Sequence, residues 1–226
     1  MNKRIIISLG GSLIAPDTID TDFLARFATF IRSKVQEGHT FVLITGGGKV
    51  CRRYQEALAT LANPTGDDLD IMGIAVTQMN ATLVRLVFKE KAHPVIVTDP
   101  LGARDIDAPI IVAAGWKPGA STDFDAVAIA EVTGAEKIIN LSNTEYVYTA
   151  DPRVDEKAEK IEKISWQEFR KLLPKKWSSG SNTPFDPIAS EKAEALGLEV
   201  AVISGNDFTA ISNCIDNLPF TGSIIS

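Results

Sequence analysis

The chain has 226 residues, of which 45% are hydrophobic and 23% are charged, a composition that is usual for a globular protein. Its net charge of −6 argues against a general nucleic-acid-binding protein, which needs a basic face. Two cysteines are too few for a disulfide scaffold, and two histidines leave little for a histidine-based metal site. We expect no apolar run of membrane-spanning length and no signal peptide. These features predict one soluble, cytoplasmic domain over residues 1–226.

Short apolar runs alternate with helical patterns from the N-terminus to about residue 141. β-Branched and aliphatic runs predict strands at 5–9, 41–44, 95–97, 110–112 and 137–141, and later at 199–204 and 221–226. Apolar residues at helical spacing predict helices at 23–35, 49–61, 71–91, 123–134, 165–173, 187–196 and 207–215, and residues 149–163 an exposed excursion. The alternation predicts an α/β fold, with a largely parallel central sheet flanked by helices.

Three glycine-rich segments follow predicted strands, at Gly10–Ser12, Gly46–Lys49 and Gly115–Asp123. Loops that follow parallel strands share one edge of the sheet, where ligands bind. Glycines let backbone N–H groups approach phosphate oxygens, and the following helix N-termini favour anions. We therefore expect phosphate binding, although the P-loop, G-x-G-x-x-G and G-x-S-x-G signatures are all absent from the sequence.

These loops belong to an ordered set of motifs that resembles the amino-acid kinase superfamily, and most closely its short, archaeal-type uridylate (UMP) kinases. The matching segments cover nearly the whole chain. They are Ile7–Ser12 (opening strand and G-G-S loop), Thr45–Lys49 with Arg52 (G-G-G-K-x-x-R), Asp70–Gly73 (D-x-x-G), Pro118–Asp123 (P-G-x-[ST]-T-D), Val147–Pro152 (V-Y-T-A-D-P) and Phe185–Ala189 (D-P-x-A).

The resemblance implies transfer of the ATP γ-phosphoryl group to UMP with Mg²⁺, in a homo-oligomer that is commonly a hexamer. A phosphate monoester is already largely anionic at pH 7, so alignment and charge neutralisation matter more than a general base. Residues 1–135 would form the acceptor and phosphate half, and residues 136–226 the ATP half. The expected ATP-binding residues are Ser8, Gly10, Gly11, Ser12, Gly48, Arg52, Ser142, Tyr148 and Asp151. The expected UMP-binding residues are Gly47, Asp70, Trp116, Lys117, Pro118, Gly119, Ala120, Ser121 and Thr122, and the expected catalytic residues are Asp123, Arg52 and Lys117.

The chain departs from the family pattern at positions that bear on catalysis. Ser8 stands where many members have a lysine that steadies the transferring phosphoryl group. Arg52 is our first candidate for the replacing cation, with Lys117 assisting, because guanidinium suits phosphate. Tyr146 replaces a glycine near the expected adenosine pocket, and the segment Trp177–Phe185 has no clear counterpart.

Several of these residues also have plain structural interpretations. Asp70 could cap a helix that begins at Ile71, and Asp123 could cap the next helix, with Asp125 as a rival carboxylate. Tyr148 could be core packing, Asp151 part of a turn, and Arg52 a solvated surface cation. Two other functions stay open: phosphorylation of a carboxylate, carbamate or isoprenoid phosphate, and nucleotide binding by a non-catalytic regulatory protein.

Overall fold

The computed structural model describes residues 4–152, 154–173 and 183–226. Their main sheet has seven strands in the order β3-β2-β1-β4-β8-β9-β7. All neighbours pair in parallel except β8 and β9, which are antiparallel. The strands are β1 (Ile5–Leu9), β2 (Phe41–Thr45), β3 (Ile110–Ala113), β4 (Lys137–Ser142), β7 (Lys163–Ile164), β8 (Glu199–Ser204) and β9 (Ser223–Ile225), and the separate pair is β5 (Val147–Tyr148) and β6 (Lys160–Ile161).

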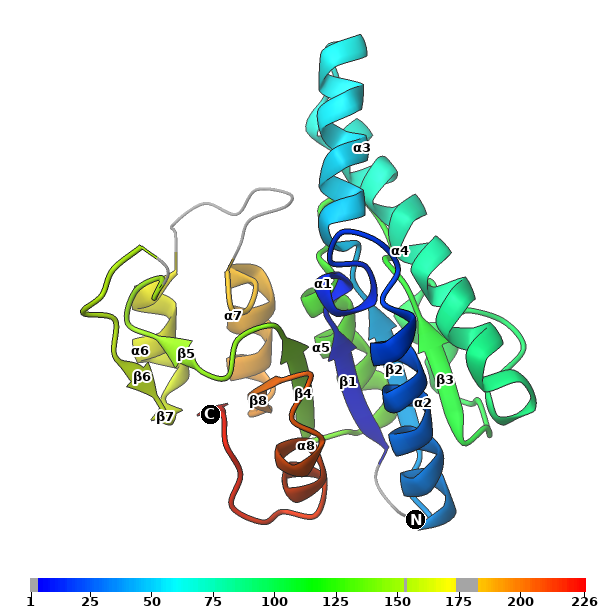
Figure 1. Cartoon of the computed structure of the whole chain (residues 1–226), viewed down its shortest axis with the longest axis vertical. Coiled ribbons are helices and arrows are strands. Elements are labelled where there is room, and N and C mark those ends of the chain that lie inside the picture. The colour runs from blue at the N-terminus through cyan, green and yellow to red at the C-terminus, as the bar shows by residue number, and fades with distance from the viewer. Residues whose placement is uncertain (1–3, 153, 174–182) are drawn as a thin grey trace.

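Helices cover both faces of the sheet (Figure 1). They are α1 (Gly11–Ile14), α2 (Thr21–Gln36), α3 (Gly48–Leu61), α4 (Gly66–Phe88), α5 (Thr122–Thr133), α6 (Trp166–Leu172), α7 (Pro187–Ala195) and α8 (Phe208–Ile215), with 3₁₀ turns η1 (Lys89–Lys91) and η2 (Pro100–Ala103). Side chains alternate across each strand, so Ile7 and Leu9 pack with α2, α4 and α8, whereas Ile6 packs with α5, α6 and α7. The expected largely parallel sheet flanked by helices is thus confirmed.

Two expected elements differ in the structure. The long helix begins at Gly66 rather than Ile71, because Thr65 and Asp68 form a capping box at its start. Residues 95–97 form no strand. The longer segment 92–97 makes two isolated bridges to the β3 edge, through Ala92 and Val97, and Val95 is 64% exposed. Pro94 removes a backbone donor from this segment, which limits its pairing.

One described stretch, Gly66–Lys91, is long and apolar enough to cross a membrane by length and composition, and 33% of its most apolar window is buried. Our expectation of no such run was therefore wrong. The helix packs against β2, β3 and α3, as the core helix of a sheet protein does. Its first half and α3 project beyond the sheet (Figure 1).

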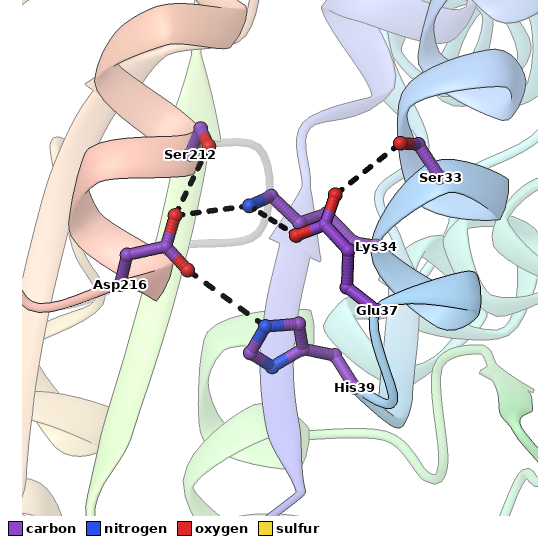
Figure 2. Close-up of polar contacts among 6 residues, drawn as sticks. All are labelled: Ser33, Lys34, Glu37, His39, Ser212 and Asp216. Atoms are coloured by element: carbon purple, nitrogen blue, oxygen red, sulfur yellow. Dashed lines mark hydrogen bonds and ion pairs between the residues drawn. The ribbon is translucent and has the colours of Figure 1, made fainter.

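A buried lysine joins the two halves of the chain at the C-terminal ends of α2 and α8 (Figure 2). Lys34 Nζ lies 2.8 Å from Glu37 Oε2 and 2.9 Å from Asp216 Oδ2, and its side chain is 8% exposed. His39 Nε2 lies 3.7 Å from the other oxygen of Asp216. Burial lowers the pKa of Lys34, but the two carboxylates outweigh burial and leave that pKa raised. The lysine ammonium is therefore shared by two carboxylates and neutralises one of their two charges.

Candidate active site

The three glycine-rich loops leave adjacent strands at the carboxyl edge of the sheet, as expected. Leu9 pairs with Thr45 at the ends of β1 and β2, and Gly46 N–H donates to Leu9 O at 2.9 Å. Gly10 N–H donates to Leu141 O at 3.0 Å, which ties the first loop to the end of β4. The N-termini of α1, α3 and α5 follow these loops directly. This edge therefore gathers the backbone donors that a polyphosphate requires.

The first two loops touch so closely that only glycine fits. A Cβ at Gly11 would lie 2.6 Å from Gly46 O, and a Cβ at Gly48 would lie 2.5 Å from Gly11 O and 3.0 Å from Ser12 N. Gly48 also has a φ of 66°, in the left-handed region that glycine favours. The structure thus brings together the expected phosphate-loop residues Gly10, Gly11, Ser12, Gly47 and Gly48.

One face of α4 holds the second and third loops. Asp70 Oδ2 accepts a hydrogen bond from Gly119 N–H at 2.7 Å. Thr77 Oγ1 accepts one from Gly115 N–H at 2.9 Å, and Asn80 Nδ2 donates to Gly46 O at 2.8 Å. Residues 70, 77 and 80 lie near one helix face because their spacing approximates whole turns. Asp70 therefore holds the loop Gly115–Ser121 by its backbone, and its interpretation as the cap of the helix was wrong, because Thr65 is the N-cap.

The loop from Gly115 to Ser121 stays largely open to solvent at its tip. Lys117, Pro118 and Gly119 are exposed, and Gly119 has a φ of 80°. Lys117 Nζ lies 3.9 Å from the centroid of the Trp116 ring, a cation–π contact. The loop ends at Ser121, whose hydroxyl caps α5 by accepting from Phe124 N–H at 3.1 Å. The tip of the loop is thus open to solvent, while its last residue, Ser121, is fixed at the start of α5.

Asp123 lies where the first loop, α5 and α7 meet. Ser8 Oγ donates to its Oδ1 at 3.3 Å, and Asp186 N–H donates to its Oδ2 at 3.1 Å. Enclosure by protein and the nearby carboxyl of Asp186 raise the pKa of Asp123 to about 7, against these two hydrogen bonds, which lower it. Because Ser121 is the N-cap of α5, the interpretation of Asp123 as that cap was wrong.

The cations beside the second loop divide into two groups. Lys49 Nζ lies 3.1 Å from Asp17 Oδ1, and Arg53 donates to Asp17 O at 3.1 Å. The exposed side chain of Arg52 makes no ion pair or hydrogen bond with any residue in the described ranges. Arg52 is thus the α3 cation near this loop that remains available for a phosphate.

The expected adenosine residues lie along the segment that follows β4. Ser142 ends β4, and its hydroxyl accepts from Thr144 N–H at 3.1 Å. Tyr148 belongs to β5 and contacts Tyr146 edge-to-face, with ring centroids 6.4 Å apart. Asp151 is exposed and begins a turn. Most of the unplaced segment 177–185 lies outside the described residues.

A separate hollow of about 470 Å³ lies at the opposite edge of the sheet. Its lining includes the first residues of β1, β4 and β8, namely Ile5, Lys137 and Glu199. No helix of the described residues begins at this hollow, so we assign the phosphate chemistry to the glycine loops instead.

Four polar residues that support the site were not among the expected site residues: Thr77, Asn80, Asp125 and Asp186. A usable signal existed for two of them, because Thr77 and Asn80 are polar residues near the helix face that carries Asp70. Asp125 was considered only as a rival to Asp123, and Asp186 only as part of a motif.

The comparisons with known proteins agree with this geometry. The amino acid kinase family model matches residues 3–204. The chain belongs to the amino acid kinase family. It is 35% identical to a uridylate kinase of Pyrococcus abyssi over 90% of this chain and 91% of that protein. It is 33% identical to a uridylate kinase of Methanocorpusculum labreanum over 98% of this chain and 95% of that protein. The crystal structure of uridylate kinase from Archaeoglobus fulgidus superposes with a TM-score of 0.84 at 28% identity, covering 98% of this chain and 99% of that one.

Proposed function

We propose that this chain is a uridylate kinase, which transfers the γ-phosphoryl group of ATP to UMP and yields UDP and ADP. Two relatives that carry this name match at 33–35% identity across at least 90% of this chain. The observation that carries the proposal is the 2.7 Å hydrogen bond between Asp70 and Gly119 N–H. It joins the D-x-x-G helix to the P-G-x-S-T-D loop, the two motifs expected to hold the acceptor.

In the proposed reaction, a phosphate oxygen of UMP attacks the γ-phosphorus of ATP. A bond forms between that oxygen and phosphorus, and the bond from phosphorus to the β,γ-bridging oxygen breaks, so ADP leaves with the electron pair. The attacking monoester has its second pKa near 6, so at pH 7 it is mostly dianionic and needs no general base. The work of the site is alignment and stabilisation of charge.

The backbone donors of the first two loops would bind the ATP phosphates, through Gly10, Gly11, Ser12 and Gly48. Ser8 lies at the end of β1 beside them. Ser142, Tyr148 and Asp151 would hold the adenosine. This division leaves Gly47, Asp70 and the loop Trp116–Thr122 for UMP. One carboxylate oxygen of Asp70 holds Gly119, and the other would accept hydrogen bonds from the ribose hydroxyls.

Positive charge must come from groups other than Ser8. We assign it to Arg52, which lacks an ion pair within the described residues, with Lys117 assisting from the acceptor loop. Transition-state charge spreads over the equatorial phosphoryl oxygens, and a planar guanidinium can donate to two of them at once.

Mg²⁺ fits the donors present in this site. Asp123 receives hydrogen bonds from neutral donors, and no cation in the described part of the chain pairs with it. Asp123 would hold the ion, which supplies positive charge at the phosphates when it is bound.

We also propose that the chain forms a homo-oligomer through the projecting α3 and α4. No residue of α3 is buried, and Leu61 is 85% exposed while Tyr54 and Ile71 are also exposed. Exposed apolar side chains on neighbouring helices are typical of a protein–protein contact. Light scattering should give more than one chain per particle, and Leu61→Asp should reduce that number.

The test of the proposed function is an acceptor screen with ATP and Mg²⁺. The panel contains UMP, carbamate, a carboxylate such as an amino acid, and an isoprenoid phosphate. We expect UDP formation from UMP and no comparable turnover of the others. Faster turnover of a non-nucleotide acceptor would overturn the proposal in favour of another kinase of the same fold. Nucleotide binding without turnover of any acceptor would favour a regulatory protein.

A further inference from the structure

Asp125 is a buried carboxylate in the first turn of α5, and it is 1% exposed. Its Oδ2 accepts a hydrogen bond from Trp116 N–H at 3.1 Å. Its Oδ1 is also buried and has no hydrogen-bond partner among the residues that the structure describes. Within the described residues the carboxylate of Asp125 thus accepts one hydrogen bond, whereas an ionised carboxylate in water can accept about four.

This arrangement destabilises the free protein relative to an apolar side chain at the same position. A buried acceptor without a partner loses its hydration and gains nothing in return. The next residues of α5, Ala126 and Val127, belong to the apolar core. Stability alone therefore does not explain a carboxylate here.

The hydrogen bond to Trp116 is one of three that hold the acceptor loop by its backbone. Thr77 and Asp70 hold Gly115 and Gly119 from α4, and Asp125 holds Trp116 from α5. The loop is thus fixed from two helices, at its first two residues and at its tip. Without the α5 contact, both remaining side-chain anchors belong to α4.

Trp116 in turn determines where the loop's cation stands. Lys117 Nζ rests 3.9 Å from the centroid of the Trp116 ring. A change in the backbone direction at Trp116 would move both the ring and the ammonium, and it would move Pro118 and Gly119 with them.

We infer that Asp125 is a positioning residue for acceptor binding, which acts by fixing Trp116 and, through it, the direction of Lys117 and the loop tip. The inference rests on the proposed function, because it takes this loop as the acceptor loop. Asp125 acts through the loop and needs no contact with the substrate, unlike Asp70.

The experiment compares Asp125→Val, Asp125→Asn and the wild type, with Asp105→Asn as an exposed control. Amide hydrogen exchange of segment 114–121 is measured without nucleotide, and KM for UMP, KM for ATP and Tm are measured separately. Asp125→Val should exchange at least about tenfold faster in this segment and raise KM for UMP about tenfold, the effect of one lost charge-assisted hydrogen bond. Its KM for ATP should stay within about twofold, and its Tm should be unchanged or higher. Asp125→Asn retains an acceptor oxygen for Trp116 N–H, so it should restore both exchange and KM to within about threefold.

Three results would overturn the inference. The first is an unchanged rate of amide exchange in segment 114–121 of Asp125→Val. The second is an exchange rate and a KM for UMP that rise equally in Asp125→Asn and Asp125→Val. The third is a rise of KM for both UMP and ATP in Asp125→Val, together with a lower Tm. The exchange measurement needs no substrate, so it decides the role of Asp125 in the loop even if the wild type fails to phosphorylate UMP. That failure would overturn the proposed function and would be visible in the wild type alone.

Discussion

Replacing Asp70 by alanine should weaken UMP binding without unfolding the protein. The substitution removes the 2.7 Å hydrogen bond to Gly119 N–H and the free oxygen that we assign to the ribose. A hydrogen bond to a charged group contributes about 1.5–3 kcal/mol. At about 1.4 kcal/mol per factor of ten, KM for UMP should rise about 10- to 100-fold, and KM for ATP should change less than about twofold.

Thr65→Ala is the matched control, because it removes the cap of the same helix and leaves the loop contact in place. Loss of an N-cap destabilises by about 0.5–2 kcal/mol, which lowers Tm by about 1–8 °C in a chain of this size. Steady-state kinetics and thermal unfolding of both variants provide the comparison. If Asp70→Ala lowers Tm as Thr65→Ala does while KM for UMP holds, then Asp70 supports the helix and has no role in acceptor binding.

Other predictions concern charge. Arg52→Ala should lower kcat by at least about a hundredfold and Lys117→Ala by about tenfold, both at unchanged Tm, because a transition-state donor typically contributes about 10²–10³ in rate. Arg53→Ala is the control, because a surface contact holds the Arg53 side chain. An equal loss of kcat in Arg53→Ala would refute this assignment. Lys34→Met should lower the free energy of unfolding by about 1–2 kcal/mol. The loss is smaller than for a fully buried ion pair because both partner carboxylates are partly exposed. An unchanged free energy of unfolding in denaturant would contradict this prediction. Because the pKa of Asp123 is raised, the folded metal-free protein keeps the proton of this carboxyl between about pH 4 and pH 7, whereas the unfolded chain has already released it. Asp123 therefore lowers the stability of the folded state as pH rises through this range. The Tm of Asp123→Asn minus that of the wild type should therefore grow from pH 4.5 to pH 7.5, and a constant difference would show that this pKa is not raised.

Most helices and long strands could be predicted because their signals are local. Alternating apolar runs and capping residues sufficed for β1, β2, α2 and α7, whose observed bounds lie within about two residues of the expected ones. The two-residue strands β5, β6 and β7 escaped prediction because they depend on pairing with distant residues, such as Ile164 with Ile225. The start of α4 was misplaced because the T-x-x-D capping box at Thr65 starts the helix upstream of the apolar pattern that begins at Ile71.

The position of the candidate site was predictable, but the state of its side chains was not. Glycine loops after parallel strands must share one edge, and the structure confirms this. Lys49 and Arg53 pair with Asp17 because the loop near residue 17 folds back on α3. This fold leaves Arg52 without an ion pair within the described residues, and no local sequence pattern predicts it. The burial of Asp125 likewise depends on how α5 packs on the sheet, which no local pattern reveals.

The most direct test of the proposed activity is the ratio of kcat/KM for UMP to that for CMP, GMP and AMP, measured with ATP and Mg²⁺. A binding site built for uracil leaves a buried donor or acceptor unpaired when it holds another base, at a cost of about 1–3 kcal/mol. We predict that UMP exceeds each of the other three by at least about tenfold. Equal turnover of all four monophosphates would contradict the assignment of this chain as a uridylate kinase.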